Sequence, residues 1–517
     1  MGIAKMVYDV VIIGAGLAGM TAALKALQQG MKTIVVSAGA SAMESMSGCL
    51  DLCGSAEKPW PALRSLVSEN PGHPYALLKE EEIHEALLFF VEQTKGSCPY
   101  HYQDGFNNFC IPTAFGNQRY TCLLPEGQLA AAAAEGRVLV VGLKGYRDFC
   151  AELMVEGMQK RGFKGWQAAE VDLDCLQLPG SGAADSSRSL NNLNNNVEIA
   201  VRLENSWQLL AEELSGKVRG FGSIAFPALL GLSQHLQVKR GLEESLGVKV
   251  FEVPTLPPSL PGMRLARTLT AGVRLLGGDL LQGFPVAAAD LKGRICSSVI
   301  VNTPGRPRRV KGKSFILATG GVLGGGIQVE REKVSEAVFH LPVINPASEA
   351  YTQETSDTQP CGTQAKHNLA DSDAYIQEDP NDAQRHWQIT ETEVELGNVE
   401  VTKDVTENRS SVILQAVPSG DENRGQSLNV NEPAIVDFSQ LPTSDLRHQT
   451  SIFKAGVRAN KLMQPLAVDG GVLLENVFCA GRILAGYDPF IEGSGAGVAI
   501  ATGYRAAVEA GRVAEDE

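Results

Sequence analysis

An apolar segment that runs directly into a glycine-rich turn is the feature that most constrains the fold of this chain. Residues 8–13 read as a strand, and Gly14, Gly16 and Gly19 follow it with the spacing G-x-G-x-x-G. The first glycine permits a tight turn, the second lets the backbone approach a phosphate, and the third lets the next helix pack closely. That helix would direct its free N–H groups at an anion. The segment therefore predicts a Rossmann-like site for a dinucleotide or a flavin.

The residues after the glycine turn supply the context that this motif requires. Residues 20–29 predict an alanine-rich helix and residues 32–37 predict a second strand, which completes a βαβ unit. A G-x-G-x-x-G match by itself is weak evidence, whereas a match between a strand and a helix is specific. The small residues that come next include Ser47 and Gly48, where the backbone can approach a cofactor closely.

A second glycine signature closes a later strand. The apolar segment 315–317 ends in Ala318, Thr319 and Gly320. In flavoproteins with two dinucleotide-binding domains, a strand with this ending passes close to the nucleotide part of the cofactor, which is why its last residues are small. We predict that these three residues belong to the same binding site as the first glycine turn.

A third signature lies near the C-terminus. A predicted strand ends at Gly481, and Asp488, Pro489, Gly495 and Gly497 precede an alanine-rich terminal helix. Glycines that open a helix would aim N–H groups and the positive helix end at the pyrimidine edge of a flavin, and would stabilise negative charge on the reduced ring. Three such signatures in this order favour a flavin over a nicotinamide cofactor.

Length and composition suit an α/β enzyme with more than one domain, since the chain has 517 residues, of which 44% are hydrophobic and 54 are glycine. We predict a Rossmann-like flavin-binding domain of the two-dinucleotide-binding-domain flavoprotein type, with an inserted second α/β or α+β domain. An amphipathic helix at 80–92 and a strand at 137–141 fall within the insert. The predicted parts are residues 6–55, 263–343 and 435–517 for the flavin-binding domain, 56–262 for the inserted cap or substrate domain, and 344–434 for a polar acidic insertion.

The negative charge of the chain is concentrated in one segment. Residues 345–432 hold 17 acidic and 5 basic side chains, a net charge of −12, which leaves only −2 of the total of −14 for the rest. The overall charge argues against nucleic acid as a partner. Because this segment also has few apolar residues to offset the cost of ordering, we predict a mobile excursion, with an isolated hairpin as the structured alternative.

The ten cysteines predict neither a zinc site nor an iron–sulfur cluster, because no C-x-x-C or ferredoxin-type spacing occurs, and no metal site is expected. Cys49 and Cys53 are interpreted as small buried residues, with a redox-active pair beside a flavin as the alternative. No stretch is apolar enough for a membrane span, and the apolar start is the first strand rather than a signal peptide. We therefore expect a cytoplasmic protein.

Outside residues 345–432, most of the chain resembles the B subunits of anaerobic glycerol-3-phosphate dehydrogenases, in the fumarate reductase-like flavoprotein group. Many families share the glycine signatures, so the resemblance depends on more specific segments. These are S-G-C-L-D-L (47–52), G-H-P-Y-A-L-L (72–78), V-V-G-L-K-G-Y-R-D-F (140–149), P-T-L-P-P-S-L-P-G-M-R-L (254–265), G-G-I-Q-V-E-R (325–331) and G-Y-D-P (486–489).

The resemblance implies an assembly of three different polypeptides that oxidises glycerol 3-phosphate to dihydroxyacetone phosphate. The A subunit would be a catalytic flavoprotein, this chain the flavin-bearing B subunit, and the C subunit an iron–sulfur protein that passes electrons to quinone at the inner face of the cell membrane. Two alternatives stay open: a flavin electron-relay protein without its own substrate site, and a stand-alone fumarate reductase-like oxidoreductase.

The predicted second strand departs from the usual FAD pattern. It ends at Ser37 and carries no Asp or Glu to bind the adenosine ribose. FMN has no adenosine ribose, and the resembling B subunits are described as FMN-binding. The sequence therefore favours FMN, with FAD as the close alternative.

No catalytic residue can be assigned from the sequence, but three side chains are candidates. Arg264 and Arg331 lie in resembling segments, and a guanidinium suits bidentate phosphate binding. An exposed or ion-paired arginine is the ordinary alternative for both. His73 in G-H-P-Y suits acid–base chemistry, with a structural hydrogen-bonding role as its alternative.

Overall fold

The computed structural model describes residues 6–54, 56–172, 196–330, 333–344 and 452–516. The candidate Arg331 and nearly all of the predicted acidic insertion at 344–434 lie outside these residues, so those two expectations stay predictions.

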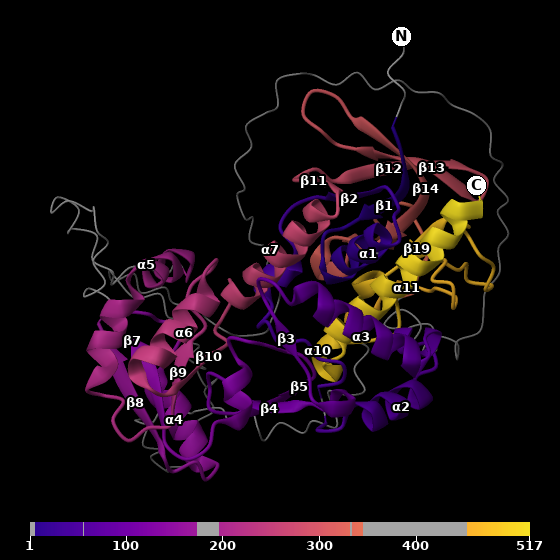
Figure 1. Cartoon of the computed structure of the whole chain (residues 1–517). Coiled ribbons are helices and arrows are strands. Elements are labelled where there is room, and N and C mark those ends of the chain that lie inside the picture. The colour runs from indigo at the N-terminus through magenta and orange to yellow at the C-terminus, as the bar shows by residue number, and fades with distance from the viewer. Residues whose placement is uncertain (1–5, 55, 173–195, 331–332, 345–451, 517) are drawn as a thin grey trace, which may run out of the picture. The chain divides into compact units, whose positions relative to one another are not determined.

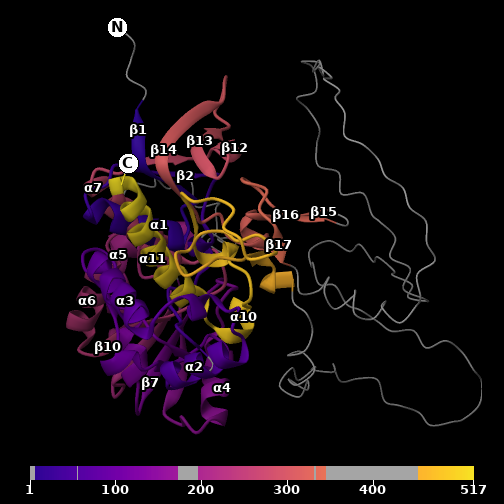
Figure 2. The same cartoon turned by 90° about the vertical axis from the view of Figure 1, so that its right-hand side faces the viewer.

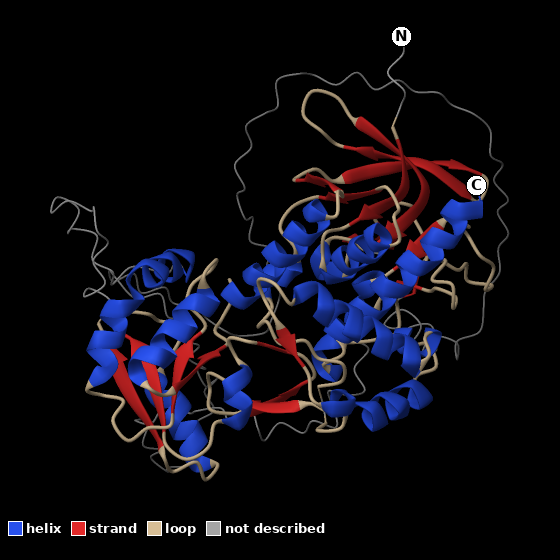
Figure 3. Ribbon diagram, in the orientation of Figure 1, coloured by secondary structure: helices blue, strands red, loops and turns tan. Residues whose placement is uncertain are grey.

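The first glycine turn follows a strand of a seven-stranded sheet (Figures 1 and 3). Its central pairs, β11–β2, β2–β1, β1–β14 and β14–β19, are parallel, whereas β12 and β13 extend it as antiparallel strands beside β14. This is the α/β arrangement with a Rossmann-like parallel core that the sequence predicts. The strands, in order across the sheet, are β11 (Asp279–Gln282), β2 (Thr33–Ser37), β1 (Val7–Ile13), β14 (Arg308–Leu317), β13 (Ile295–Val301) and β12 (Val286–Lys292), with β19 (Val477–Cys479) on β14.

Helices α1 (Leu17–Gln28) and α11 (Gly495–Asp516) lie side by side against this sheet (Figures 1 and 2). Their alanine-rich, buried faces allow the close approach that this packing needs. Helices α3 (Glu80–Thr94) and α7 (Leu260–Leu275) pack next to them.

Helix α1 begins at Leu17, three residues before the predicted start at residue 20. The extended backbone of Gly16 ends the turn and caps the helix, so Gly19 belongs to the first helical turn rather than to the loop before it. A Cβ atom on Gly19 would lie 1.9 Å from the Gly14 carbonyl oxygen, which explains why glycine is needed there.

A second, fully parallel sheet comes from the middle of the chain. Side chains of this sheet and of the helices packed on it form a separate buried hydrophobic cluster, which includes Trp166, Phe226 and Phe251. All its strands fall within the predicted insert, and β7 contains most of the strand expected at 137–141; the division into domains itself stays a prediction. The strands are β10 (Lys249–Val253), β9 (Ser223–Pro227), β7 (Val138–Leu143) and β8 (Trp166–Val171), accompanied by α4 (Ala151–Lys160), α5 (Asn196–Ser215) and α6 (His235–Leu246).

Short elements complete the described structure. The largest is helix α2 (Pro59–Glu69), and none of the described helices is both long and apolar enough to cross a membrane. The remaining described strands form two-stranded pairs, and one short α-helix is left, α10 (Pro489–Glu492). The pairs are β3 (Tyr100–His101) with β6 (Leu124–Pro125), β4 (Phe109–Pro112) with β5 (Gln118–Thr121), β15 (Ile327–Glu330) with β16 (Lys333–Glu336), and β17 (Val343–Ile344) with β18 (Gly456–Val457).

Candidate functional site

The three glycine signatures converge at one edge of the large sheet. Ile13, the last residue of β1, pairs with Leu317 of β14, and Leu317 pairs with Cys479 of β19. The residues that follow these three strands therefore leave the sheet at the same level. In open α/β sheets, ligands bind in the crevice outside the carboxyl ends of the strands.

A cavity of ≈ 270 Å³ opens at this edge. Five of the residues predicted to bind the cofactor line it, and they come from all three signatures, which lie far apart in the sequence. These five are Gly16, Ala318, Gly320, Pro489 and Gly495.

Other predicted glycines lie behind the cavity wall, where they allow elements to approach each other. A Cβ atom on Gly14, whose φ is +115°, would lie 2.2 Å from the Ala318 carbonyl oxygen. A Cβ on Gly481 would lie 2.7 Å from the Ala18 side chain, and one on Gly497 would lie 2.2 Å from the Tyr75 hydroxyl. These positions shape the site without lining it.

Thr319 and Asp488 carry the polar side chains of the second and third signatures. The Thr319 hydroxyl is buried between the cavity residues Ala318 and Gly320 and has no hydrogen-bond partner among the described residues. Asp488 is buried and caps α10, because its carboxylate accepts a hydrogen bond of 3.0 Å from the Phe490 N–H. Asp488 therefore holds Pro489 and Phe490 in the cavity wall.

The predicted residues Ser47 and Gly48 lie on a segment that is held in place by three hydrogen bonds to two side chains. The Gln128 side chain donates to the Ser47 carbonyl at 2.8 Å, and the Tyr100 hydroxyl donates to the Gly48 carbonyl at 2.7 Å. Cys49 follows, and its thiol donates to the Gln128 side chain at 3.0 Å. Burial raises the pKa of the Cys49 thiol to about 11, so it stays protonated at neutral pH.

Sequence reasoning missed several side chains of the cavity. Met43, Met46 and Phe490 contribute apolar walls, and no motif marks them. Arg482 is the one charged residue among those that line the cavity, and its place directly after Ala480-Gly481 was a signal that could have identified it. Its guanidinium donates to the Phe453 carbonyl at 2.9 Å and so remains close to the wall. Arg482 gives the cavity a fixed positive charge, which suits a phosphate or a reduced flavin.

A second cavity of ≈ 340 Å³ lies beside the carboxyl end of β2. Ala15 lines this cavity and Gly16 lines the first, whereas Met43 lines both, so the glycine turn lies between the two. Glu44 also lines the second cavity. A carboxylate is therefore present near the carboxyl end of β2. It lies later in the chain than the position after β2 at which FAD proteins usually carry an acidic residue.

The structure gives His73 a buried position with both ring nitrogens engaged. Its Nδ1 accepts a hydrogen bond of 3.0 Å from the Tyr75 N–H, and its Nε2 lies 3.1 Å from a Glu492 carboxylate oxygen. The same carboxylate oxygen accepts from the Ser494 hydroxyl at 2.8 Å. These contacts favour the structural alternative, in which His73 positions the loop between α10 and α11.

Arg264 is likewise buried, and it faces the second sheet. Its guanidinium forms a bidentate pair with Glu252 and donates to the Gly231 carbonyl at 2.8 Å. Burial acts to raise the pKa of Glu252, but the positive charge and hydrogen bonds of Arg264 have the larger effect. The pKa of Glu252 is therefore lowered. His235 lies nearby, and burial, followed by repulsion from Arg264, lowers its pKa to about 3. The arrangement favours an ion pair that joins α7 to β10 over a phosphate-binding role for Arg264.

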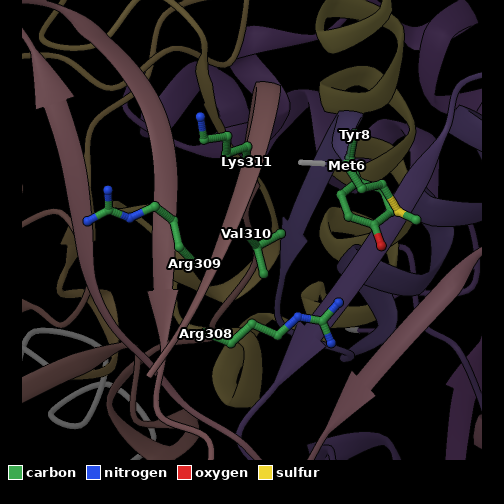
Figure 4. A pocket seen from close by; sticks show the side chains of 6 residues that line it. All are labelled: Met6, Tyr8, Arg308, Arg309, Val310 and Lys311. Atoms are coloured by element: carbon green, nitrogen blue, oxygen red, sulfur yellow. The ribbon is translucent and has the colours of Figure 1, made fainter. Parts of the chain in front are cut away.

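A third cavity, of ≈ 200 Å³, is basic but lies at the wrong edge of the sheet for the glycine turn. It is lined at the amino ends of β1 and β14 by Met6, Tyr8, Arg308, Arg309 and Lys311, among others. Arg308 extends toward Tyr8, whereas Arg309 extends to the opposite side (Figure 4) and pairs with Asp290. Because the parallel strands end at the other edge, this cavity is separate from the cavity at the glycine turn.

The described part of the chain contains no group of three or more His, Cys, Asp or Glu side chains that could hold a metal ion. Cys49 and Cys53 are both buried, and neither forms a disulfide bond.

Comparisons with known proteins identify the family of the chain. The family described as FAD binding domain matches residues 9–498 of the chain. The chain is 26% identical over 514 residues to the B subunit of the anaerobic glycerol-3-phosphate dehydrogenase of Vibrio cholerae, covering 97% of this chain and 96% of that protein. A protein of the same name from Actinobacillus pleuropneumoniae is 29% identical over 351 residues, which cover 65% of this chain and 80% of the relative.

Among solved structures, the chain is similar to 3-ketosteroid delta1-dehydrogenase from Sterolibacterium denitrificans, with a TM-score of 0.28 and 15% identity. The alignment covers 61% of this chain and 48% of that one. The sheet topology and the family match, rather than this likeness, establish the fold.

Proposed function

The chain belongs to the FAD binding domain family of flavin-dependent oxidoreductases, and from this premise we propose that it is the flavin-bearing B subunit of an anaerobic glycerol-3-phosphate dehydrogenase. The observation that carries the proposal is the cavity at which three distant glycine signatures meet. The similarity to curated B subunits over nearly the whole chain supports the choice of substrate.

The residues around the cavity fit a flavin. Gly16 leaves open space at the N-terminal end of helix α1, and Arg482 supplies a positive charge. Met43 and Met46 add apolar surface that would exclude water from the ring. When bound, a flavin supplies two-electron chemistry, and the protein positions it and tunes its electronics.

We propose that the flavin is FAD, with FMN as the alternative that the sequence favoured. The second cavity supports FAD, because a cofactor with an adenosine half would extend across the glycine turn from Gly16 to Ala15 and occupy both cavities. Glu44 stands where it can replace the ribose-binding acid that is missing after Ser37.

Replacing Glu44 with alanine is expected to weaken FAD binding about tenfold and to leave FMN binding unchanged. The loss corresponds to one charge-assisted hydrogen bond to a ribose hydroxyl, of the order of 1.4 kcal/mol. Fluorescence titration of the apoprotein with each flavin measures both affinities, and Glu81→Ala, which removes an exposed carboxylate on α3, is the control. Equal losses for FAD and FMN would contradict the assignment, as would FMN in the mass spectrum of the extracted cofactor.

In the proposed reaction the substrate is sn-glycerol 3-phosphate and the product is dihydroxyacetone phosphate. The electrons would continue through an iron–sulfur protein, the C subunit, to quinone, and a catalytic flavoprotein, the A subunit, would complete the assembly. This chain would reach the membrane only through those partners, from the cytoplasmic side.

An anaerobic titration of the purified full-length chain with glycerol 3-phosphate tests the proposal. We expect a flavin spectrum in the purified protein and bleaching of that flavin by the substrate. A protein that carries no flavin and takes up neither FAD nor FMN would overturn the proposal. Bleaching only after a catalytic partner is added would support the electron-relay alternative, and turnover of fumarate without partners would support a stand-alone reductase.

A further inference from the structure

The guanidinium of Arg482 is fixed at the wall of the ≈ 270 Å³ cavity without a carboxylate beside it. It donates to the Phe453 carbonyl at 2.9 Å and to the Tyr487 carbonyl at 3.5 Å, and its central carbon lies 5.0 Å from the centre of the Tyr487 ring. No carboxylate of the described residues forms an ion pair with it. Two carbonyl groups and an aromatic ring therefore position this cation without neutralising it.

The guanidinium keeps N–H donors for a ligand. It carries more donors than the two carbonyl groups accept, and the Nε of Arg482 is neither buried nor hydrogen-bonded to a described residue. Burial raises the pKa of the Tyr487 hydroxyl to about 12, against the opposing effect of Arg482. Tyr487 is therefore uncharged at neutral pH and supplies no negative charge to the cation.

Arg482 lies where the cavity opens to solvent. Two side chains that line the cavity, Leu323 and Phe490, are 76% and 65% exposed. The ring of Phe453, the residue whose carbonyl binds the guanidinium, packs edge-on against Phe490 with ring centres 5.0 Å apart. A Cβ atom on Gly321 would lie 3.6 Å from Nη2 of Arg482, so the glycine leaves the guanidinium uncovered at that point. A small anion can therefore reach Arg482 from solvent.

The surroundings of Arg482 indicate which anion it would bind. Arg482 is the one charged residue among those that line the cavity, and apolar side chains such as Met46 reduce the screening of its charge. The phosphate of the cofactor has a binding group of its own in the N-terminal end of helix α1, which begins directly after Gly16. Arg482 is thus available for a second anion, and a guanidinium matches a phosphate through two parallel hydrogen bonds.

We propose that Arg482 binds the phosphate group of a small phosphate ester substrate where the cavity opens to solvent. The inference rests on the proposed function and deepens it, because it places a substrate-binding residue on this chain rather than on a partner protein. A cofactor phosphate and the negative charge of the reduced flavin are the two other anions that a guanidinium here would attract. The test below separates the three sources.

Calorimetric titration of the flavin-loaded full-length chain with dihydroxyacetone phosphate tests the inference, because the proposed product binds without reducing the flavin. We expect Arg482→Met to weaken its binding at least about tenfold, the effect of one charge-assisted hydrogen bond. Arg482→Lys, which keeps the charge but not the paired donors, should weaken it about threefold. Dihydroxyacetone, which lacks the phosphate, should bind weakly and equally to all variants. Arg64→Met, which breaks the exposed pair with Glu80, is the matched control.

Two further measurements identify the anion if the expected loss is not found. Wild-type affinity for dihydroxyacetone phosphate in either folded variant would overturn the inference. In that case, weaker binding of FAD to the apoprotein would assign Arg482 to a cofactor phosphate, and a lower midpoint potential of the bound flavin would assign it to the reduced ring. Loss of flavin from Arg482→Met would overturn the inference in favour of the cofactor phosphate as well.

The remaining outcomes distinguish the inference from the proposed function. Thermal unfolding checks the fold of each variant, and Arg482→Lys provides the measurement if Arg482→Met does not fold. A wild-type chain that holds flavin but binds no dihydroxyacetone phosphate overturns the inference alone. A wild-type chain that takes up no flavin overturns the proposed function itself.

Discussion

Replacing Gly16 with valine is expected to weaken flavin binding at least about 100-fold while the protein stays folded. A Cβ atom at this position meets nothing within 4 Å, and the extended backbone at φ −74° is accessible to any residue. The added side chain would instead project into the space where the cofactor must approach the N-terminal end of helix α1. A loss of this size is about 2.7 kcal/mol of binding free energy.

Flavin content and the affinity of the apoprotein for flavin measure the effect, and thermal unfolding checks the fold. Gly96→Val is the control, because a Cβ at Gly96 also meets nothing within 4 Å and the residue lies outside the cavity. Gly14→Val should behave differently and destabilise the protein, since its Cβ would overlap the Ala318 carbonyl. Normal flavin content in Gly16→Val would show that the cofactor does not use this turn.

Replacing Arg264 with methionine is expected to destabilise the protein by about 3–5 kcal/mol, because the buried carboxylate of Glu252 would lose its partner. The double variant Arg264→Met, Glu252→Leu removes both charges and should recover much of this loss. Urea unfolding measures each variant. Arg64→Gln, at an exposed pair, should change stability by less than about 1 kcal/mol.

The same cluster predicts a loss of stability in acid. The folded pKa of Glu252 is lowered, so its contribution is present above the pKa of the unfolded chain and is lost as pH falls through the folded value. His235, with a folded pKa of about 3, acts in the same direction, because the unfolded chain binds a proton from about pH 6.5 downward. Unfolding free energies measured between pH 7 and pH 4 should fall, and the fall should be smaller in His235→Phe.

A different result for Arg264→Met would make Arg264 a candidate substrate-binding residue again. If Arg264→Met unfolded like the wild type but lost affinity for glycerol 3-phosphate, the guanidinium would be serving a ligand rather than Glu252. The sequence could not separate these roles, because it does not show that helix α7 packs with Arg264 against Glu252 of strand β10.

The comparison of sequence and structure is most informative at the cofactor site. The glycine spacing identified the turn, and the two later signatures identified the other walls, because close backbone approach leaves a visible requirement for small residues. Met43, Met46 and Phe490 left no such mark, since an apolar residue is compatible with any buried surface. Glu44, which we propose as the ribose ligand, carries no sequence signal, because the pattern expects an acid at the end of the second strand and Glu44 comes later in the chain.

The sequence by itself determined the local chemistry: a strand, a glycine turn and a helix suited to a phosphate, and later strands with small-residue endings. These features depend on backbone geometry within a few residues, so they can be read from spacing alone. Only the tertiary structure decided which distant side chains share a cavity, that His73 and Arg264 are buried with partners, and that Arg482 lines the cavity without an ion-pair partner among the described residues. Those facts depend on contacts between different elements of the chain, and burial and pairing, rather than residue type, determine what each charged group can do.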